Sequence, residues 1–289
     1  VTAPVTDADR DAAVQRGLLE AHMRARPGGG SESLGAALAV FDGIPAAVVP
    51  SPKLRAAIAG LTGTFAEPAI TSLMTSDNCT SRPVAKVAFE VPEGNEALVA
   101  RVTFLRGARV ISVNPFAEGE RFEYLMPILA HEAVHCDTED GIAEEIAATA
   151  FDGFLYLQLL AVDPELAAAR TRVARELNID AVAMINSGQR YPESIGILPS
   201  PGVDAVLPLT NNASKSFAEL VANAYRGLPN APTPAETVAT AYTSLLAAAI
   251  GVELKNPFDL AYLDELLSLA VDGGVFANAI VAFDLVPEG

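Results

Sequence analysis

The alternation of hydrophobic and polar positions divides the chain into a helical start, a short β region and a long helical remainder. Residues 7–26 have helical spacing, and Thr6 or Asp7 can cap this helix. Its apolar stripe is predicted to consist of Val14, Leu18, Leu19 and Met23. Shorter helices are predicted at residues 34–41 and 52–61.

The hydrophobic period changes to two between residues 84 and 113, which is typical of β-strands. Strands are predicted at residues 84–91, 98–105 and 109–113. The turns between them contain Pro92-Glu93-Gly94-Asn95 and Arg106-Gly107. This pattern predicts a small antiparallel meander.

Helical spacing returns downstream of the strands. An apolar stretch at residues 128–134 precedes a polar turn at 137–141, and a second helix is expected at about 142–160. A Pro/Gly-rich interruption lies between residues 185 and 212. Further helix starts are marked by cap residues, at Asp163-Pro164, Thr233-Pro234, Asn256-Pro257 and Ser216-x-x-Glu219.

These patterns predict an α+β fold that is predominantly α, with a small antiparallel sheet beside a pair of helices and a helical C-terminal half. Three segments are expected. Residues 1–83 form a mostly helical segment, residues 84–162 a core of sheet and two helices, and residues 163–289 a helical subdomain. Hydrophobic residues make up 51% of the 289, which is ample material for buried cores of this size.

The charge balance argues against one class of partner. The chain has 36 Asp and Glu against 19 Lys and Arg, a formal charge of −17, and no stretch concentrates its basic residues. Such a chain repels phosphate backbones, so nucleic-acid binding is not expected.

Two further expectations concern membranes and location. No apolar run approaches the roughly 18 residues of a membrane span, so no span is expected. The stretch Val1-Thr2-Ala3-Pro4-Val5-Thr6 resembles the small-residue start of a mature chain after removal of a signal peptide. This favours a secreted or otherwise extracytoplasmic protein and leaves a cytoplasmic one open.

The candidate chemistry is concentrated in one stretch. His131, Glu132 and His135 form the pattern H-E-x-x-H among apolar neighbours, and the whole chain has only three histidines. On a helix this spacing places both imidazoles on one face, about one turn apart, where a single cation can bind both. The alternative is a coincidental match to a pattern with three fixed positions, which predicts no metal.

With this motif the chain resembles the zincin metallopeptidases, and within them the gluzincin branch. The resemblance rests on residues 131–135, on the stretch Glu145-Ile146-Ala147-Ala148-Thr149, and on the upstream strand at 110–114. It implies that His131, His135 and Glu145 hold Zn²⁺, with Glu144 as the alternative third ligand. It also implies that strand 110–114 is an edge strand, which can hold an extended peptide by strand addition.

The function implied by the resemblance is hydrolysis of peptide bonds in a peptide or protein substrate. A zinc-bound water would be the nucleophile and Glu132 the general base. Thr149 and Asp152 are candidates for orienting the imidazoles. The alternative is a non-catalytic zinc-binding or scaffold protein that retains a zincin-like fold. Peptide hydrolysis also needs a group that stabilises the negatively charged oxygen, the oxyanion, of the reaction intermediate. Three residues are candidates for this role, and the sequence does not choose among them: Tyr191, Arg190 and His22.

The two cysteines, Cys79 and Cys136, belong to no C-x-x-C pattern. In an exported protein they could form a disulfide that ties the segment before the strands to the end of the metal-binding helix. Two buried free thiols are the alternative.

Overall fold

The structure, a computed structural model, is mostly helical with a small three-stranded mixed sheet, which confirms the predicted α+β class. It describes residues 6–27, 30–74, 83–94, 96–136, 141–186, 198–199, 206–207, 217–229 and 238–251. The chain forms two compact units, Val1–Ala133 and Val134–Gly289. The division into three segments expected from the sequence stays a prediction.

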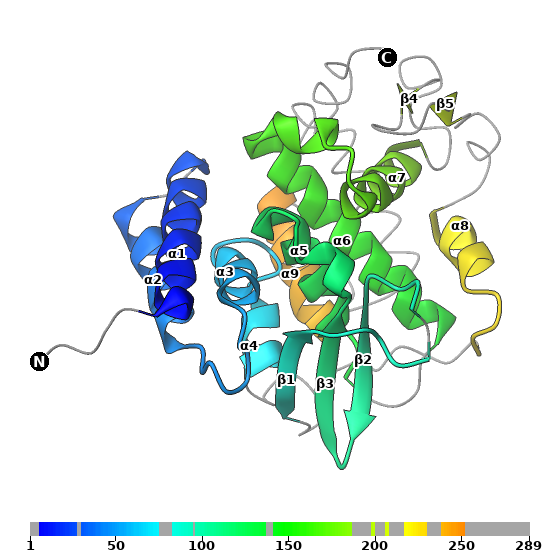
Figure 1. Ribbon diagram of the computed structural model, residues 1–289. Helices are drawn as coiled ribbons and strands as arrows, with labels where there is room; N and C mark the ends of the chain where they lie inside the picture. The colour runs from blue at the N-terminus through cyan, green and yellow to red at the C-terminus, as the bar shows by residue number, and fades with distance from the viewer. Residues whose placement is uncertain are drawn as a thin grey trace, which may run out of the picture. The chain divides into compact units, whose positions relative to one another are not determined.

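The first unit begins with helix α1 (Asp7–Ala25), which packs against α2 (Ser31–Gly43) and α3 (Pro52–Gly60) (Figure 1). Of the two caps that the sequence offers, Thr6 is the N-cap, and it forms a capping box with Asp9. The Asp9 N–H donates to the Thr6 hydroxyl (3.2 Å), and the Thr6 N–H donates to the Asp9 carboxylate (2.8 Å). This hydrogen bonding also lowers the pKa of Asp9.

The apolar stripe predicted for α1 is half wrong. Leu19 and Met23 are buried, but Val14 and Leu18 are 57% and 49% exposed. The buried face is completed by two polar residues, Gln15 and His22. Helical periodicity cannot distinguish Leu18 from Leu19, and the packing of α2 and α3 against α1 selects the face that is buried.

Helix α3 lies at the centre of the first unit and packs against α1, α2 and the later helix α5 (Phe122–Glu132). Ser51 is its N-cap, and a proline lies in its first turn. Seven of its nine residues are buried. The short helix α4 (Pro68–Met74) follows it and packs against α3 and the first strand.

The sheet contains β1 (Val84–Phe89), β2 (Ala100–Leu105) and β3 (Ala108–Val113) in the order β1-β3-β2 (Figure 1). Strand β3 is antiparallel to β2 and parallel to β1. The predicted antiparallel meander is therefore wrong, and so is the prediction that strand 110–114 lies at an edge, because β3 is central.

The connections explain this strand order. Strands β2 and β3 form a hairpin whose turn residues, Arg106 and Gly107, both have positive φ (50° and 83°), as a tight hairpin turn requires. By contrast, ten residues of the sequence, 90–99, separate β1 from β2, so no tight turn forces these two strands to pair. Asn114, which follows β3, fixes this connection by donating its side-chain amide to the carbonyls of Glu96 and Leu98 (2.9 and 3.0 Å).

The second unit is built around α6 (Ile142–Val162), close to the span predicted from the sequence. It packs against α7 (Arg172–Asn186), α8 (Phe217–Ala224), α9 (Val238–Ile250) and the 3-10 helix η2 (Pro164–Ala168). Asp163 caps η2, so the predicted start is right in position, although the helix that follows it is 3-10.

Two short strands, β4 (Leu198–Pro199) and β5 (Val206–Leu207), pair antiparallel. The helix starts predicted at Ser216, Thr233 and Asn256 lie outside the described residues.

Helix α6 has the length and hydropathy of a membrane span. However, 83% of its most apolar window is buried inside the protein, and a buried core helix meets the same criterion. The expected absence of a span stays a prediction.

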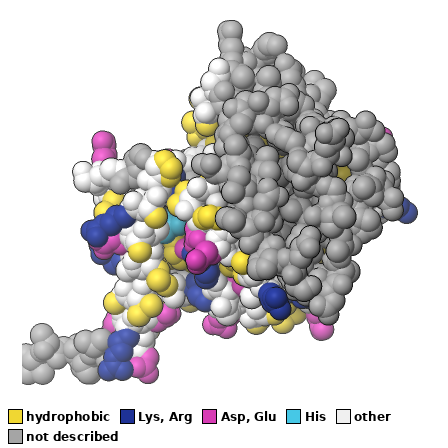
Figure 2. Space-filling model, turned by 90° about the horizontal axis from the view of Figure 1, so that it is seen from above, with side chains coloured by type: hydrophobic (Ala, Val, Ile, Leu, Met, Phe, Trp, Pro, Cys, Tyr) yellow, Lys and Arg dark blue, Asp and Glu magenta, His cyan; other side chains and the backbone are white. Residues whose placement is uncertain are grey.

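The described surface mixes charges of both signs. Figure 2 shows one face on which, among the described side chains, acidic and basic groups are interspersed with apolar ones. On α1 and α2, arginines are paired with acids, as in Arg16–Asp42 (3.2 Å) and Arg10–Asp7 (3.0 Å). The expectation that the chain does not bind nucleic acid is untested.

Candidate metal centre

Helix α5 carries the first two residues of the H-E-x-x-H motif. It follows the 3-10 helix η1 (Pro115–Ala117), and nearly all of its residues are buried. Within the first unit it packs against α3 and β2. The apolar residues of the motif region are therefore core residues, as the sequence indicates.

The helix ends earlier than predicted. Its last residue is Glu132, and Ala133 is its C-cap, so His135 lies beyond the helix. The expectation that both imidazoles lie on one helical face is therefore wrong. The Ala133 carbonyl, which a continuing helix would use, instead accepts a hydrogen bond from the Ser72 hydroxyl (3.0 Å).

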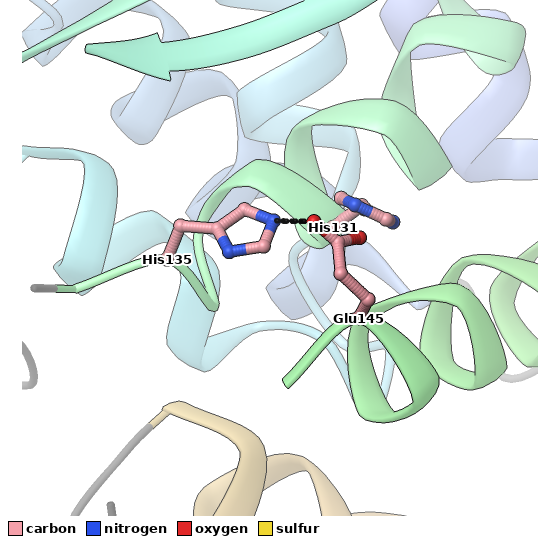
Figure 3. Close-up of side chains that lie close together, drawn as sticks. All are labelled: His131, His135 and Glu145. Atoms are coloured by element: carbon pink, nitrogen blue, oxygen red, sulfur yellow. Dashed lines mark ion pairs between the residues drawn. The ribbon is translucent and has the colours of Figure 1, made fainter. Parts of the chain in front are cut away.

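The structure nevertheless brings the expected ligands together. One ligand atom each of His131, His135 and Glu145 lies within 4.8 Å of the other two (Figure 3). His135 and Glu145 are buried and His131 is half-buried. Glu145 lies in the first turn of α6, and its Oε1 is 3.9 Å from Nε2 of His135.

Glu144 and Glu145 occupy different positions around His135. The Oε1 atom of Glu144 lies 2.9 Å from Nδ1 of His135, on the opposite side of the ring from Glu145. Both glutamates are buried. The group that could hold a metal therefore contains Glu145, while Glu144 contacts the other ring nitrogen.

The donor set suits a divalent metal ion. Two imidazole nitrogens and one carboxylate oxygen are typical of three-residue zinc sites that keep a fourth position open. Ligands about 2.1 Å from a tetrahedral zinc are roughly 3.4 Å apart. The ligand atoms of this group, which lie within 4.8 Å of one another, would therefore move closer by up to about 1.4 Å to bind zinc. Other transition metals accept the same donors, and the donors alone do not identify the metal.

Three other candidate residues lie on the same elements. Glu132, the candidate base, is buried at the end of α5. Thr149 and Asp152, one and two turns after Glu145 on α6, are also buried, so they do not lie on a solvated helix face. Within the described part of the chain the Thr149 hydroxyl has no hydrogen-bond partner. The role of both residues in orienting the imidazoles stays a prediction.

The oxyanion candidates are only partly described. His22 is a packed residue of α1. Its Nδ1 is 3.9 Å from Oε1 of Glu123, and its ring meets the ring of Phe122 edge-on with centroids 5.4 Å apart. Tyr191 and Arg190 lie outside the described residues.

Cys136, directly after the second histidine, is buried and disulfide-bonded. The other cysteine of the chain, Cys79, lies outside the described residues. Their predicted pairing therefore stays a prediction.

A buried arginine that no sequence motif marks lies near the end of α5. Arg109 of β3 is fully buried, and its guanidinium donates to the hydroxyl (3.3 Å) and the carbonyl of Ser72. Burial lowers the pKa of Arg109 to about 10. The Ser72 hydroxyl also donates a hydrogen bond to the Ala133 carbonyl at the end of α5. Arg109 therefore supports the end of this helix through Ser72. The only signal in the sequence was one arginine at the start of an apolar strand.

The described residues define an α+β protein with a candidate His₂Glu metal centre. Comparison of the chain with protein-family models, curated proteins and solved structures found no match. These comparisons therefore identify no family, and the structure supports a buried His131, His135 and Glu145 group that could hold a metal.

Proposed function

We propose that this protein is a zinc-dependent metallopeptidase. The observation that supports this most directly is the grouping of His131, His135 and Glu145, with Glu132 buried at the end of the same helix as His131. Three protein ligands leave a coordination position for water or substrate, as a catalytic zinc site requires.

In this proposal each residue has one role. His131, His135 and Glu145 hold the metal. Bound zinc would lower the pKa of water and polarise the carbonyl of the scissile peptide bond. Glu132 would accept the proton of the attacking water and pass it to the leaving amine.

The substrate would be a peptide in an extended conformation. In the described sheet, β2 pairs only with β3, and it packs against α5 within the first unit. On the opposite edge, the Val87 N–H of β1 already donates to the Val48 carbonyl (2.9 Å). We therefore assign strand addition to β2, instead of the strand expected from the sequence.

We also propose that the protein acts outside the cytoplasm. The disulfide-bonded state of Cys136 supports this location, because such bonds persist mainly in oxidising compartments.

The test combines metal content with peptide cleavage. The purified protein should contain about one zinc per chain by plasma mass spectrometry, and His131→Ala should contain none. Glu132→Gln should retain zinc and lose cleavage of a peptide library. Glu118→Gln, a matched change at an exposed position, should leave both unchanged.

Two results would contradict the proposal. Wild type that contains no zinc and takes up none when it is added has no metal centre. Wild type that binds zinc but cleaves no peptide is a zinc-binding protein without peptidase activity.

A further inference from the structure

Two consecutive glutamates contact the two nitrogens of one imidazole. Glu144 Oε1 is 2.9 Å from Nδ1 of His135, and Glu145 Oε1 is 3.9 Å from Nε2. All three residues belong to the second unit, and all three are buried. Consecutive helical residues point about 100° apart, so the first turn of α6 can direct its two carboxylates to different sides of the ring.

The two distances correspond to different interactions. A separation of 2.9 Å is a hydrogen bond, which for a carboxylate acceptor requires the proton on Nδ1. A separation of 3.9 Å is too long for a hydrogen bond, but it is near the roughly 3.4 Å between two ligands of one zinc ion. A proton held on Nδ1 leaves the lone pair of Nε2 for a metal.

Both carboxylates are suitably placed as anions at the start of a helix. The N-cap of α6 is Gly141, which has no side chain to cap the first N–H groups. The positive end of the helix dipole therefore favours the negative charges of Glu144 and Glu145 in the first turn. This reduces the cost of burying two adjacent glutamates.

We infer that Glu144 is a positioning residue for His135. It holds Nδ1–H and thereby fixes the tautomer and the orientation in which Nε2 faces the metal, and it does not itself bind the metal. This inference rests on the proposed metal centre but goes beyond it, because it assigns different roles to two neighbouring glutamates.

The test compares zinc affinity across matched variants, using a chelating indicator as competitor. Glu144→Ala should weaken zinc binding by about 10- to 100-fold, as loss of a hydrogen-bonded partner behind a ligand does elsewhere. Glu144→Gln should stay closer to wild type, because its amide oxygen can still accept from Nδ1–H. Glu145→Ala, which removes a ligand, should weaken binding at least tenfold more than Glu144→Ala. Glu118→Ala at an exposed position is the control.

A second readout distinguishes positioning from general stability. In the zinc-loaded protein, ¹⁵N-resolved NMR should show a protonated Nδ1 on His135, and the chain's three histidines make assignment simple. That Nδ1–H signal should persist in Glu144→Gln and be shifted or lost in Glu144→Ala. A role limited to fold stability would leave it unchanged in both variants.

Each outcome leads to a decision. If Glu144→Ala binds zinc within threefold of wild type, or as weakly as Glu145→Ala does, the inference is wrong. If wild type binds no zinc, the proposed function and the inference both fail. If wild type binds zinc without cleaving peptides, only the proposed function fails, and the affinity series still tests the role of Glu144.

Discussion

At the scale of single residues, Arg109 shows how the structure supports its candidate centre. A charged side chain that is fully buried is costly unless hydrogen bonds compensate for the lost water. Arg109 donates to both the hydroxyl and the carbonyl of Ser72. The planar guanidinium suits this pair of acceptors, and the compact ammonium of lysine does not.

We therefore expect Arg109→Lys to lower the free energy of unfolding by about 2–4 kcal/mol, since a buried charge loses part of its hydrogen bonding. Urea denaturation monitored by circular dichroism measures the change. The matched control is Arg101→Lys on β2, at an exposed position, which should stay within about 0.5 kcal/mol of wild type. Equal changes in the free energy of unfolding at the two positions would show that the buried hydrogen bonds of Arg109 do not stabilise the fold.

At the scale of elements, close packing in the second unit depends on a glycine in α6. A Cβ atom added at Gly153 would lie 2.2 Å from the sulfur of Met184 on α7. By contrast, a Cβ atom at Gly17, in the exposed face of α1, would meet nothing within 4 Å. The same substitution should therefore have opposite effects in the two helices.

Gly17→Ala should raise the free energy of unfolding by about 0.5–1 kcal/mol, because alanine favours the helix. Gly153→Ala should lower it by about 1–2 kcal/mol, because displacing Met184 costs more than the helix propensity gains. Denaturant titration of both variants tests this. Stabilisation by Gly153→Ala would mean that α7 can move away at little cost.

A second prediction about elements concerns the contact of α9 with α6. Tyr242 on α9 is fully buried and meets the ring of Phe151 edge-on, with centroids 5.1 Å apart. Burial raises the pKa of Tyr242 well above its usual value of 10. Above about pH 10 the unfolded chain releases this proton while the folded protein keeps it, so the folded state binds more protons.

The contribution of Tyr242 to stability is therefore complete below about pH 10 and is lost as the pH rises further. We expect the urea midpoint of wild type to fall more steeply between roughly pH 9 and 11 than that of Tyr242→Phe. Tyr225→Phe, at a half-exposed position of the same unit, should keep the wild-type slope. Parallel curves for all three proteins would argue against a buried, protonated Tyr242.

At the scale of the whole molecule, a metal that binds only the folded chain must stabilise it. Zinc at about 1,000 times its dissociation constant would add about 4 kcal/mol. Removing it by dialysis against a chelator should lower the thermal midpoint of wild type, and added zinc should restore the midpoint. His131→Ala should show the same midpoint with and without zinc. An equal response of this variant would place the metal elsewhere.

Local patterns in the sequence were sufficient for a helix cap at Thr6 or Asp7, for the positions of the three strands, for the start of α6, and for His131 and His135 as candidate ligands. These features depend on residues close together in the chain. Capping, hairpin turns and periodicity act over a few residues, so the sequence alone contains their physical cause.

Only the tertiary structure decided features that depend on distant residues. The pairing of β1 with β3, the buried face of α1, and the end of α5 at Glu132 depend on contacts that periodicity does not encode. The different positions of Glu144 and Glu145 around His135 depend on how α6 approaches that ring. Adjacent residues with the same chemistry have the same local pattern, so only their distances to His135 distinguish them.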